Sequence, residues 1–139
     1  MTITRSPAVA GMFYPARPAV LAATVDRLLA AAPPTEALQP KALIVPHAGY
    51  VYSGSTAAMA YAALAPWHSA IHRVVLLGPT HRVAVDGIAV PKTDAFATPL
   101  GDIRIDAAGV AAIASLPQLV FSDAVHAFEH SLEVQLPFL

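Results

Sequence analysis

Two short apolar runs, each followed directly by a turn that carries a histidine, constrain this fold more than any other feature. Ala42–Val45 is ended by Pro46 and precedes His47, and Arg73–Leu77 leads into the turn Gly78-Pro-Thr-His81. Continuous apolar runs bounded by turn residues are typical of strands that are buried on both faces of a parallel sheet. We therefore predict that both runs are buried strands of one largely parallel sheet.

Apolar residues at helical spacing occupy much of the chain around these runs. The predicted helices cover residues 18–32, 55–64, 107–116 and 123–139, and further short strands cover 87–90 and 103–105. Alternation of apolar strands with short helices indicates an α/β fold. The sheet is expected to be largely parallel.

Composition narrows the classes of function. The 139 residues suit one domain, and a net charge of -1 lacks the broad basic surface that a nucleic-acid-binding protein needs. No apolar stretch approaches the roughly 18 residues of a membrane span, so we expect neither nucleic acid nor membrane as a partner. The N-terminus does not resemble a secretory signal, and with no cysteine in the sequence we expect a cytoplasmic chain. Its chemistry must come from His, Asp, Glu, Ser, Thr and Tyr.

The histidines after the two runs are the first candidate site. His47 and His81 each follow a predicted strand, and ligands of open α/β sheets bind beyond the carboxyl ends of the strands. On neighbouring strands the two imidazoles would converge, and neutral imidazole is the commonest metal ligand among side chains. The alternative is that each histidine only caps a strand end. His68 and His72 precede the second run and are interpreted as surface or structural residues.

The segment from His126 to Glu133 holds the densest functional chemistry. His126 and His130 are four residues apart, which on a helix places them on one face, and with Glu129 they match the H-x-x-E-H pattern of inverted zinc peptidases. A pattern of five residues is a weak signal, and such a site needs a third metal ligand. Glu133 is a poor candidate for that ligand, because it lies too close to His130 on the same predicted helix.

Tyrosine hydroxyls lie close after His47. Tyr50 and Tyr52 could orient a substrate beside a metal, or they could simply pack the loop. Ser53 lacks the G-x-S-x-G context of a serine hydrolase, so that class of enzyme is not indicated.

Five sequence blocks together resemble the Memo-like family, whose prokaryotic members are called AmmeMemoRadiSam system protein B. The resemblance runs in order from about Ser6 to Leu139. The blocks are Ala10-Gly-Met-Phe-Tyr-Pro15, Pro46-His-Ala-Gly-Tyr-Val-Tyr-Ser-Gly54, Leu77-Gly-Pro-Thr-His81, Thr98-Pro-Leu-Gly-Asp102 and Glu129-His-Ser-Leu-Glu-Val-Gln-Leu-Pro-Phe138. The family is in turn similar in structure to the LigB-type subunit of class III extradiol dioxygenases, which use non-heme iron(II). The resemblance implies an incomplete three-layer α/β fold, with a largely parallel sheet flanked by helices.

This resemblance implies roles for single residues. His47 and His81 match the family's metal-facing histidines, and His130 matches a pocket histidine that acts as acid/base in the dioxygenase relatives. Carboxylates that could orient the imidazoles are Asp123, Glu129 and Glu133. Iron(II) is the expected metal, with copper or zinc as alternatives, and a chain without the rest of the site could also hold none.

The family resemblance also makes this chain look incomplete. Members are roughly twice as long, so residues 1–139 correspond to the N-terminal half of a single Memo-like domain. The remaining metal-facing residue, a Cys in Memo-like members and a Glu in the dioxygenase relatives, would lie downstream. We also expect an exposed apolar face through which the chain associates with itself.

Three functions remain open. The first is metal-dependent redox or dioxygenase-like chemistry on a small molecule. The second is a non-catalytic scaffold that works with radical-SAM and AMMECR-type partners, as the system name implies. The third is an inactive fragment.

Overall fold

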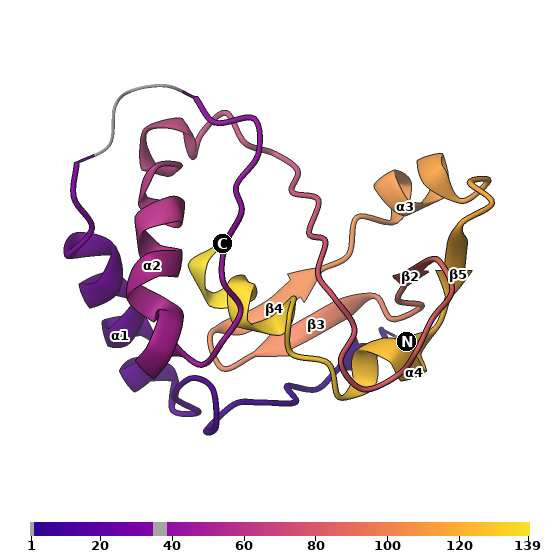
Figure 1. Cartoon of the computed structure of the whole chain (residues 1–139), viewed down its shortest axis with the longest axis horizontal. Helices are drawn as coiled ribbons and strands as arrows, with labels where there is room; N and C mark the ends of the chain where they lie inside the picture. The colour runs from indigo at the N-terminus through magenta and orange to yellow at the C-terminus, as the bar shows by residue number, and fades with distance from the viewer. Residues whose placement is uncertain (1, 35–38) are drawn as a thin grey trace.

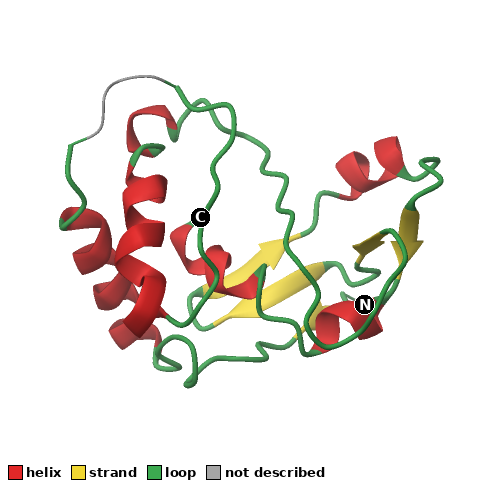
Figure 2. Cartoon of the chain, viewed as in Figure 1, coloured by secondary structure: helices red, strands yellow, loops and turns green. Residues whose placement is uncertain are grey.

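The fold combines helices with two small sheets, which confirms the predicted α/β class (Figures 1 and 2). A computed structural model describes residues 2–34 and 39–139. The helices are α1 (Pro18–Ala30), α2 (Tyr50–Ala62), α3 (Ala107–Ile113), α4 (Asp123–Ala127) and the 3-10 helices η1 (Ala65–Trp67) and η2 (Glu133–Phe138). The strands are β1 (Thr4–Arg5), β2 (Ile88–Val90), β3 (Ala95–Thr98), β4 (Gly101–Arg104) and β5 (Leu119–Phe121). Among the described residues, no helix has the length and hydropathy of a transmembrane span.

Helices α1 and α2 lie side by side and bury one face each (Figure 1). Pro18 opens α1, where its missing N–H costs no hydrogen bond, and Leu21 and Val25 face the core. Helix α2 begins five residues before the predicted Ser55, because the Gly49 carbonyl already accepts the first helical hydrogen bonds. At Gly54 an added Cβ would lie 3.1 Å from a methyl carbon of Leu28, so glycine permits the close approach of the two helices.

The sheets are small. In the first, β3 pairs in parallel with β1 and antiparallel with β4, while in the second β2 and β5 form a parallel pair. Strand β2 confirms the prediction at 87–90, and β4 lies slightly earlier than the predicted 103–105. Helix α3 follows its predicted cap, since the Asp106 carboxylate accepts the N–H of Gly109 at 2.9 Å.

The two apolar runs are not strands, and both strand predictions were wrong. Residues 42–45 and 73–77 are extended but belong to neither sheet, and Ile44, Val75 and Leu77 are strongly exposed. Within the described ranges, neither run makes a backbone–backbone hydrogen bond. Local sequence favours an extended chain, but a strand forms only where a second strand completes its hydrogen bonds.

The predicted helix at 123–139 is broken into α4 and η2, with an irregular segment at 128–132 between them. The carboxylate of Glu129 accepts the backbone N–H groups of His130 and Ser131, at 2.8 and 3.0 Å. These side-chain bonds replace helical ones and turn the chain. The helix therefore ends at Ala127, before His130.

A buried ion pair fastens the N-terminal segment to the C-terminal one. Glu133 has no exposed surface, and its carboxylate accepts from Arg5 Nη1 and Tyr14 Oη, both at 2.6 Å. It also accepts the backbone N–H groups of Ala8 and Val9, at 2.7 and 3.0 Å. Arg5 in turn donates to backbone carbonyls of the C-terminal segment. The two ends of the chain are thus joined by charge-assisted hydrogen bonds.

Candidate metal centre

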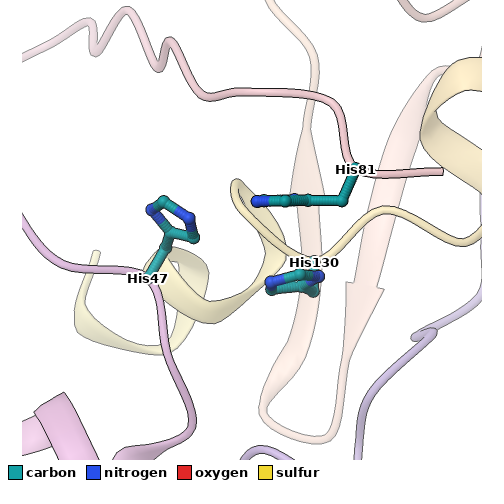
Figure 3. A group of neighbouring side chains, drawn as sticks. All are labelled: His47, His81 and His130. Carbon is teal, nitrogen blue, oxygen red and sulfur yellow. The ribbon is translucent and has the colours of Figure 1, made fainter. Parts of the chain in front are cut away.

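Three histidines from distant parts of the sequence come together in one cluster. His47, His81 and His130 each offer one ring nitrogen, and these nitrogens all lie within 4.8 Å of one another. The rings of His81 and His130 are stacked with centroids 4.6 Å apart, and the ring of His47 is tilted toward both (Figure 3). The predicted convergence of His47 and His81 is therefore present, although the runs before them are not paired strands.

His47 is held by the loop between the first run and α2. The carbonyl of Pro46 accepts a hydrogen bond from the Gln135 side chain at 3.1 Å. Just beyond the histidine, the N–H of Tyr50 donates to the carbonyl of Phe13 at 2.7 Å. Contacts to η2 and to the N-terminal loop therefore fix the loop on both sides of His47.

His81 is oriented by Glu129. Its Nδ1–H donates to a Glu129 carboxylate oxygen at 2.9 Å, and its backbone N–H donates to the other oxygen. This contact leaves Nε2 of His81 as the nitrogen free to act as a ligand. A carboxylate oriented in this way is common behind metal-binding imidazoles, and Glu129 was one of the three carboxylates expected in that role.

The hydrogen bonds also hold Glu129 ionised. Burial alone would raise the pKa of its carboxyl, but the bonds donated by His81, Ser131 and His130 outweigh burial and lower the pKa to about 2. The negative charge at the back of the cluster is therefore present at neutral pH. It favours a cation on the histidine side.

His130 lies at the turn that Glu129 creates. Its ring contacts Phe13 with centroids 4.6 Å apart, and burial is the main cause that lowers its pKa. The next residue, Ser131, donates its hydroxyl to the carbonyl of Pro79 at 2.8 Å, which joins this turn to the loop of His81. An added Cβ at Gly78 would lie 2.8 Å from that hydroxyl, so the loop contact requires glycine there. The lowered pKa favours the neutral form of the His130 imidazole, and the turn that carries it is joined to the loop of His81.

A cavity of about 570 Å³ opens beside the histidines. His47 and His130 are its nitrogen-bearing side chains, and the rest of the lining is Met12, Phe13, Pro46, Ala48, Gly49 and Tyr52. Tyr52 is 86% exposed at the edge of this cavity. Tyr50, by contrast, is buried against Tyr14 and Phe138, and its hydroxyl donates to the Val134 carbonyl at 2.8 Å. The structure therefore brings Tyr52, but not Tyr50, to the cavity.

The remaining predicted residues lie away from the cluster. Asp123 accepts the backbone N–H groups of Lys92 and Thr93, and Glu133 bonds Arg5 and the N-terminal loop. His126 donates to the carbonyl of Ala89 at 3.2 Å and contacts Phe96.

The expectation that His126 and His130 share one helix face is wrong, because α4 ends between them. His126 is also absent from the histidine cluster, so the H-x-x-E-H pattern does not form a paired site among the described residues. His68 and His72 are exposed, as expected for surface residues.

Sequence reasoning missed two contributors to the site. Phe13 packs on His130, and Arg5 donates to the carbonyls of His126 and Glu129, at 2.8 and 2.5 Å, on the segment that carries the cluster's third histidine. The presence of a single arginine in the N-terminal segment was the only sequence signal for this role. The role itself depends on a bonding partner more than 120 residues away, which the local sequence does not reveal.

Comparison with known proteins places the whole described site inside one family. The family profile described as "Memo-like protein" matches residues 5–139. A MEMO1 family protein of Aquifex aeolicus is 44% identical over 135 residues, which cover 97% of this chain and 49% of the relative. MEMO1 family proteins of Archaeoglobus fulgidus and Methanocaldococcus jannaschii are 39% and 38% identical, covering 97% and 100% of this chain and 48% and 52% of the relatives. The chain thus spans about half the length of the curated relatives it matches.

Proposed function

This chain belongs to the Memo-like family, and we propose that it binds iron(II) at its histidine cluster and serves metal-dependent redox chemistry on a small molecule. The observation that carries the proposal is the cluster itself, in which the nitrogens of His47, His81 and His130 lie within 4.8 Å of one another. Imidazole suits iron, copper and zinc alike, so the donor set fits a transition metal rather than calcium or magnesium.

The nitrogens of the cluster lie somewhat farther apart than two ligands of one bound metal ion. Two nitrogens bound to one ion at about 2.1 Å stand at most roughly 4.2 Å apart. The cluster is slightly wider than this limit, and small side-chain rotations would close the difference. The ionised Glu129 behind His81 adds the carboxylate that often accompanies metal-binding imidazoles.

The residues of the chain have distinct tasks in this proposal. His47 and His81 hold the metal, and Glu129 fixes the tautomer of His81. His130 keeps a neutral imidazole beside them, which can accept a proton from a substrate in the adjoining cavity. Tyr52 orients that substrate at the edge of the cavity. Bound iron(II) would supply the one-electron chemistry with dioxygen that these side chains lack.

Anaerobic titration with iron(II) tests the site. We expect the wild type to bind one ion per chain, and the His47→Ala/His81→Ala variant to bind it at least tenfold more weakly. His68→Ala is the matched control, since His68 is exposed and lies outside the cluster. Equal affinity of the wild type and the double variant would overturn the proposal, and a parallel titration with zinc would rank the metals.

Two further variants separate the roles of Glu129 and His130. Glu129→Gln should weaken iron(II) binding by about 10–100-fold, the usual cost of losing a carboxylate behind a metal-binding imidazole. His130→Ala should leave affinity within a few-fold of the wild type if His130 moves protons, whereas a loss comparable to that of the double variant makes it a ligand. Oxygen uptake by the iron-loaded chain with a catechol then tests redox chemistry. No uptake would favour a binding or scaffold function.

A further inference from the structure

Glu133 is a buried carboxylate that the proposed function does not use. It has no exposed surface and lies outside the histidine cluster of the described residues, yet it accepts four hydrogen bonds. The donors are Arg5 Nη1, Tyr14 Oη and the backbone N–H groups of Ala8 and Val9, at 2.6–3.0 Å. Desolvation offsets much of the attraction within a buried ion pair, so the pair adds little stability beyond what packed apolar side chains would give. Its directional hydrogen bonds do, however, fix the groups around it in one geometry.

The first connection from this carboxylate to the site runs through Arg5. The guanidinium that pairs with Glu133 also donates to the carbonyls of His126 and Glu129, at 2.8 and 2.5 Å. The Glu129 carbonyl belongs to the peptide bond that leads into His130, and the N–H of that peptide donates to the Glu129 carboxylate at 2.8 Å. Both polar groups of this peptide are therefore held, which restricts the direction in which the His130 side chain leaves the backbone.

The second connection runs through the loop from Val9 to Tyr14, which Glu133 holds at both ends. The carboxylate accepts the N–H of Val9 at 3.0 Å and the hydroxyl of Tyr14 at 2.6 Å. Inside the loop, the Val9 carbonyl accepts the N–H of Phe13 at 2.9 Å. The Phe13 ring contacts the His130 ring with centroids 4.6 Å apart. The position of this aromatic contact therefore depends on the same carboxylate.

We propose that Glu133 is a positioning residue for His130, which it reaches through Arg5 and through the loop that carries Phe13. The inference rests on the proposed function, because it concerns the imidazole that accepts a proton there. Through Arg5 the carboxylate fixes the backbone beneath this imidazole, and through the loop it keeps the Phe13 ring against it. A proton acceptor has to stay within hydrogen-bond reach of its substrate, and the two supports hold His130 at the wall of the cavity.

Nuclear Overhauser effects between the ring protons of Phe13 and His130, recorded on the metal-free chain, test the loop connection. Their strength falls steeply with distance. In Tyr14→Phe the buried carboxylate loses one of its donors, so the cross-peak should weaken by about threefold or more. Tyr61→Phe is the matched control, since it removes a buried hydroxyl that donates to Gln135, and it should leave the cross-peak as in the wild type.

Arg5→Lys tests the backbone connection. Lysine keeps a positive charge beside Glu133 but lacks the fork of donors that reaches the carbonyls of His126 and Glu129 together. The carbonyl carbon resonance of Glu129 should move upfield, as it does when that oxygen loses a hydrogen bond, and the same cross-peak should weaken. Arg27→Lys makes the same replacement at an exposed position of α1 and should change neither signal.

These signals report geometry within the folded state, so a general loss of stability does not move them. Unchanged signals in Tyr14→Phe or in Arg5→Lys would overturn the proposal, as would equal changes in the control variants. The absence of the cross-peak from the wild type would overturn it as well. Because no metal is added, failure of the chain to bind iron(II) would refute the proposed function without altering these results.

Discussion

The two apolar runs (residues 42–45 and 73–77, here called the open runs) and the segments joined by the Arg5–Glu133 ion pair (residues 5–9 and 126–138, here called the paired ends) are both rich in apolar residues, yet they differ in burial. Val134 lies fully buried beside the Arg5–Glu133 ion pair, whereas Ile44 and Val75 face outward. The paired ends even bury the charged groups of Arg5 and Glu133, because each finds several partners there. Burial therefore follows from available partners and not from hydropathy alone.

The contrast also separates two kinds of support for the site. His130 lies on the segment held by Arg5 and Glu133, where hydrogen bonds and packing act together. His47 and His81 lie in the loops that follow the open runs. The loop of His47 is held by hydrogen bonds to Gln135 and Phe13, and His81 by two hydrogen bonds to Glu129. Changes among the paired ends should therefore reduce global stability, and changes in the open runs should not.

The largest expected effect is at the ion pair. Glu133→Gln leaves the buried Arg5 guanidinium without its counter-charge, which should lower the free energy of unfolding by about 3–5 kcal/mol. Urea denaturation measures this change. Asp102→Asn makes the same carboxylate-to-amide replacement on exposed β4 and should have little effect. Similar losses of unfolding free energy in both variants would mean that the Arg5–Glu133 ion pair stabilises the fold no more than an exposed carboxylate does.

A matched pair of leucines compares the two regions more directly. Leu21→Ala removes a side chain with no exposed surface and should cost about 2–5 kcal/mol of unfolding free energy. Leu77→Ala removes the same atoms from an exposed position and should change stability by no more than about 0.5 kcal/mol. The same denaturation experiment serves both variants. A large loss for Leu77→Ala would show that the second open run is packed in solution.

These outcomes bear on what the sequence could predict. Helix α1 was predictable because its apolar spacing, its opening proline and the Pro33-Pro34 stop are all local signals. The open runs carried an equally clear local pattern, but strand formation depends on a neighbour that the pattern does not contain. The predicted α/β class is correct despite this error, because the helices and the other strands form.

Predictions for the site also succeeded where they rested on local sequence and failed where they depended on distant contacts. The meeting of His47 and His81 was predicted from their equivalent positions after two similar runs, although loop contacts and not paired strands bring them together. The break before His130 was not foreseen, because it depends on Glu129 bonding backbone N–H groups instead of facing solvent. Likewise, nothing near Tyr50 in the sequence shows that its hydroxyl reaches Val134 rather than a substrate.

The smallest predicted effect concerns alkaline pH and again belongs to the packed region. Burial raises the pKa of Tyr61 to about 12, and its hydroxyl donates to Gln135 at 2.9 Å. The folded protein therefore keeps this proton above pH 10, where the unfolded chain releases it, so stability should fall as pH rises from about 10 to 12. Tyr61→Phe should make this decline shallower by up to about 1.4 kcal/mol per pH unit.

Urea denaturation at several pH values measures both slopes, with the pH 7 values giving the separate cost of the lost hydrogen bond. An unchanged slope would mean that the Tyr61 hydroxyl is open to solvent in the folded protein, and that the end of α2 does not belong to the packed region.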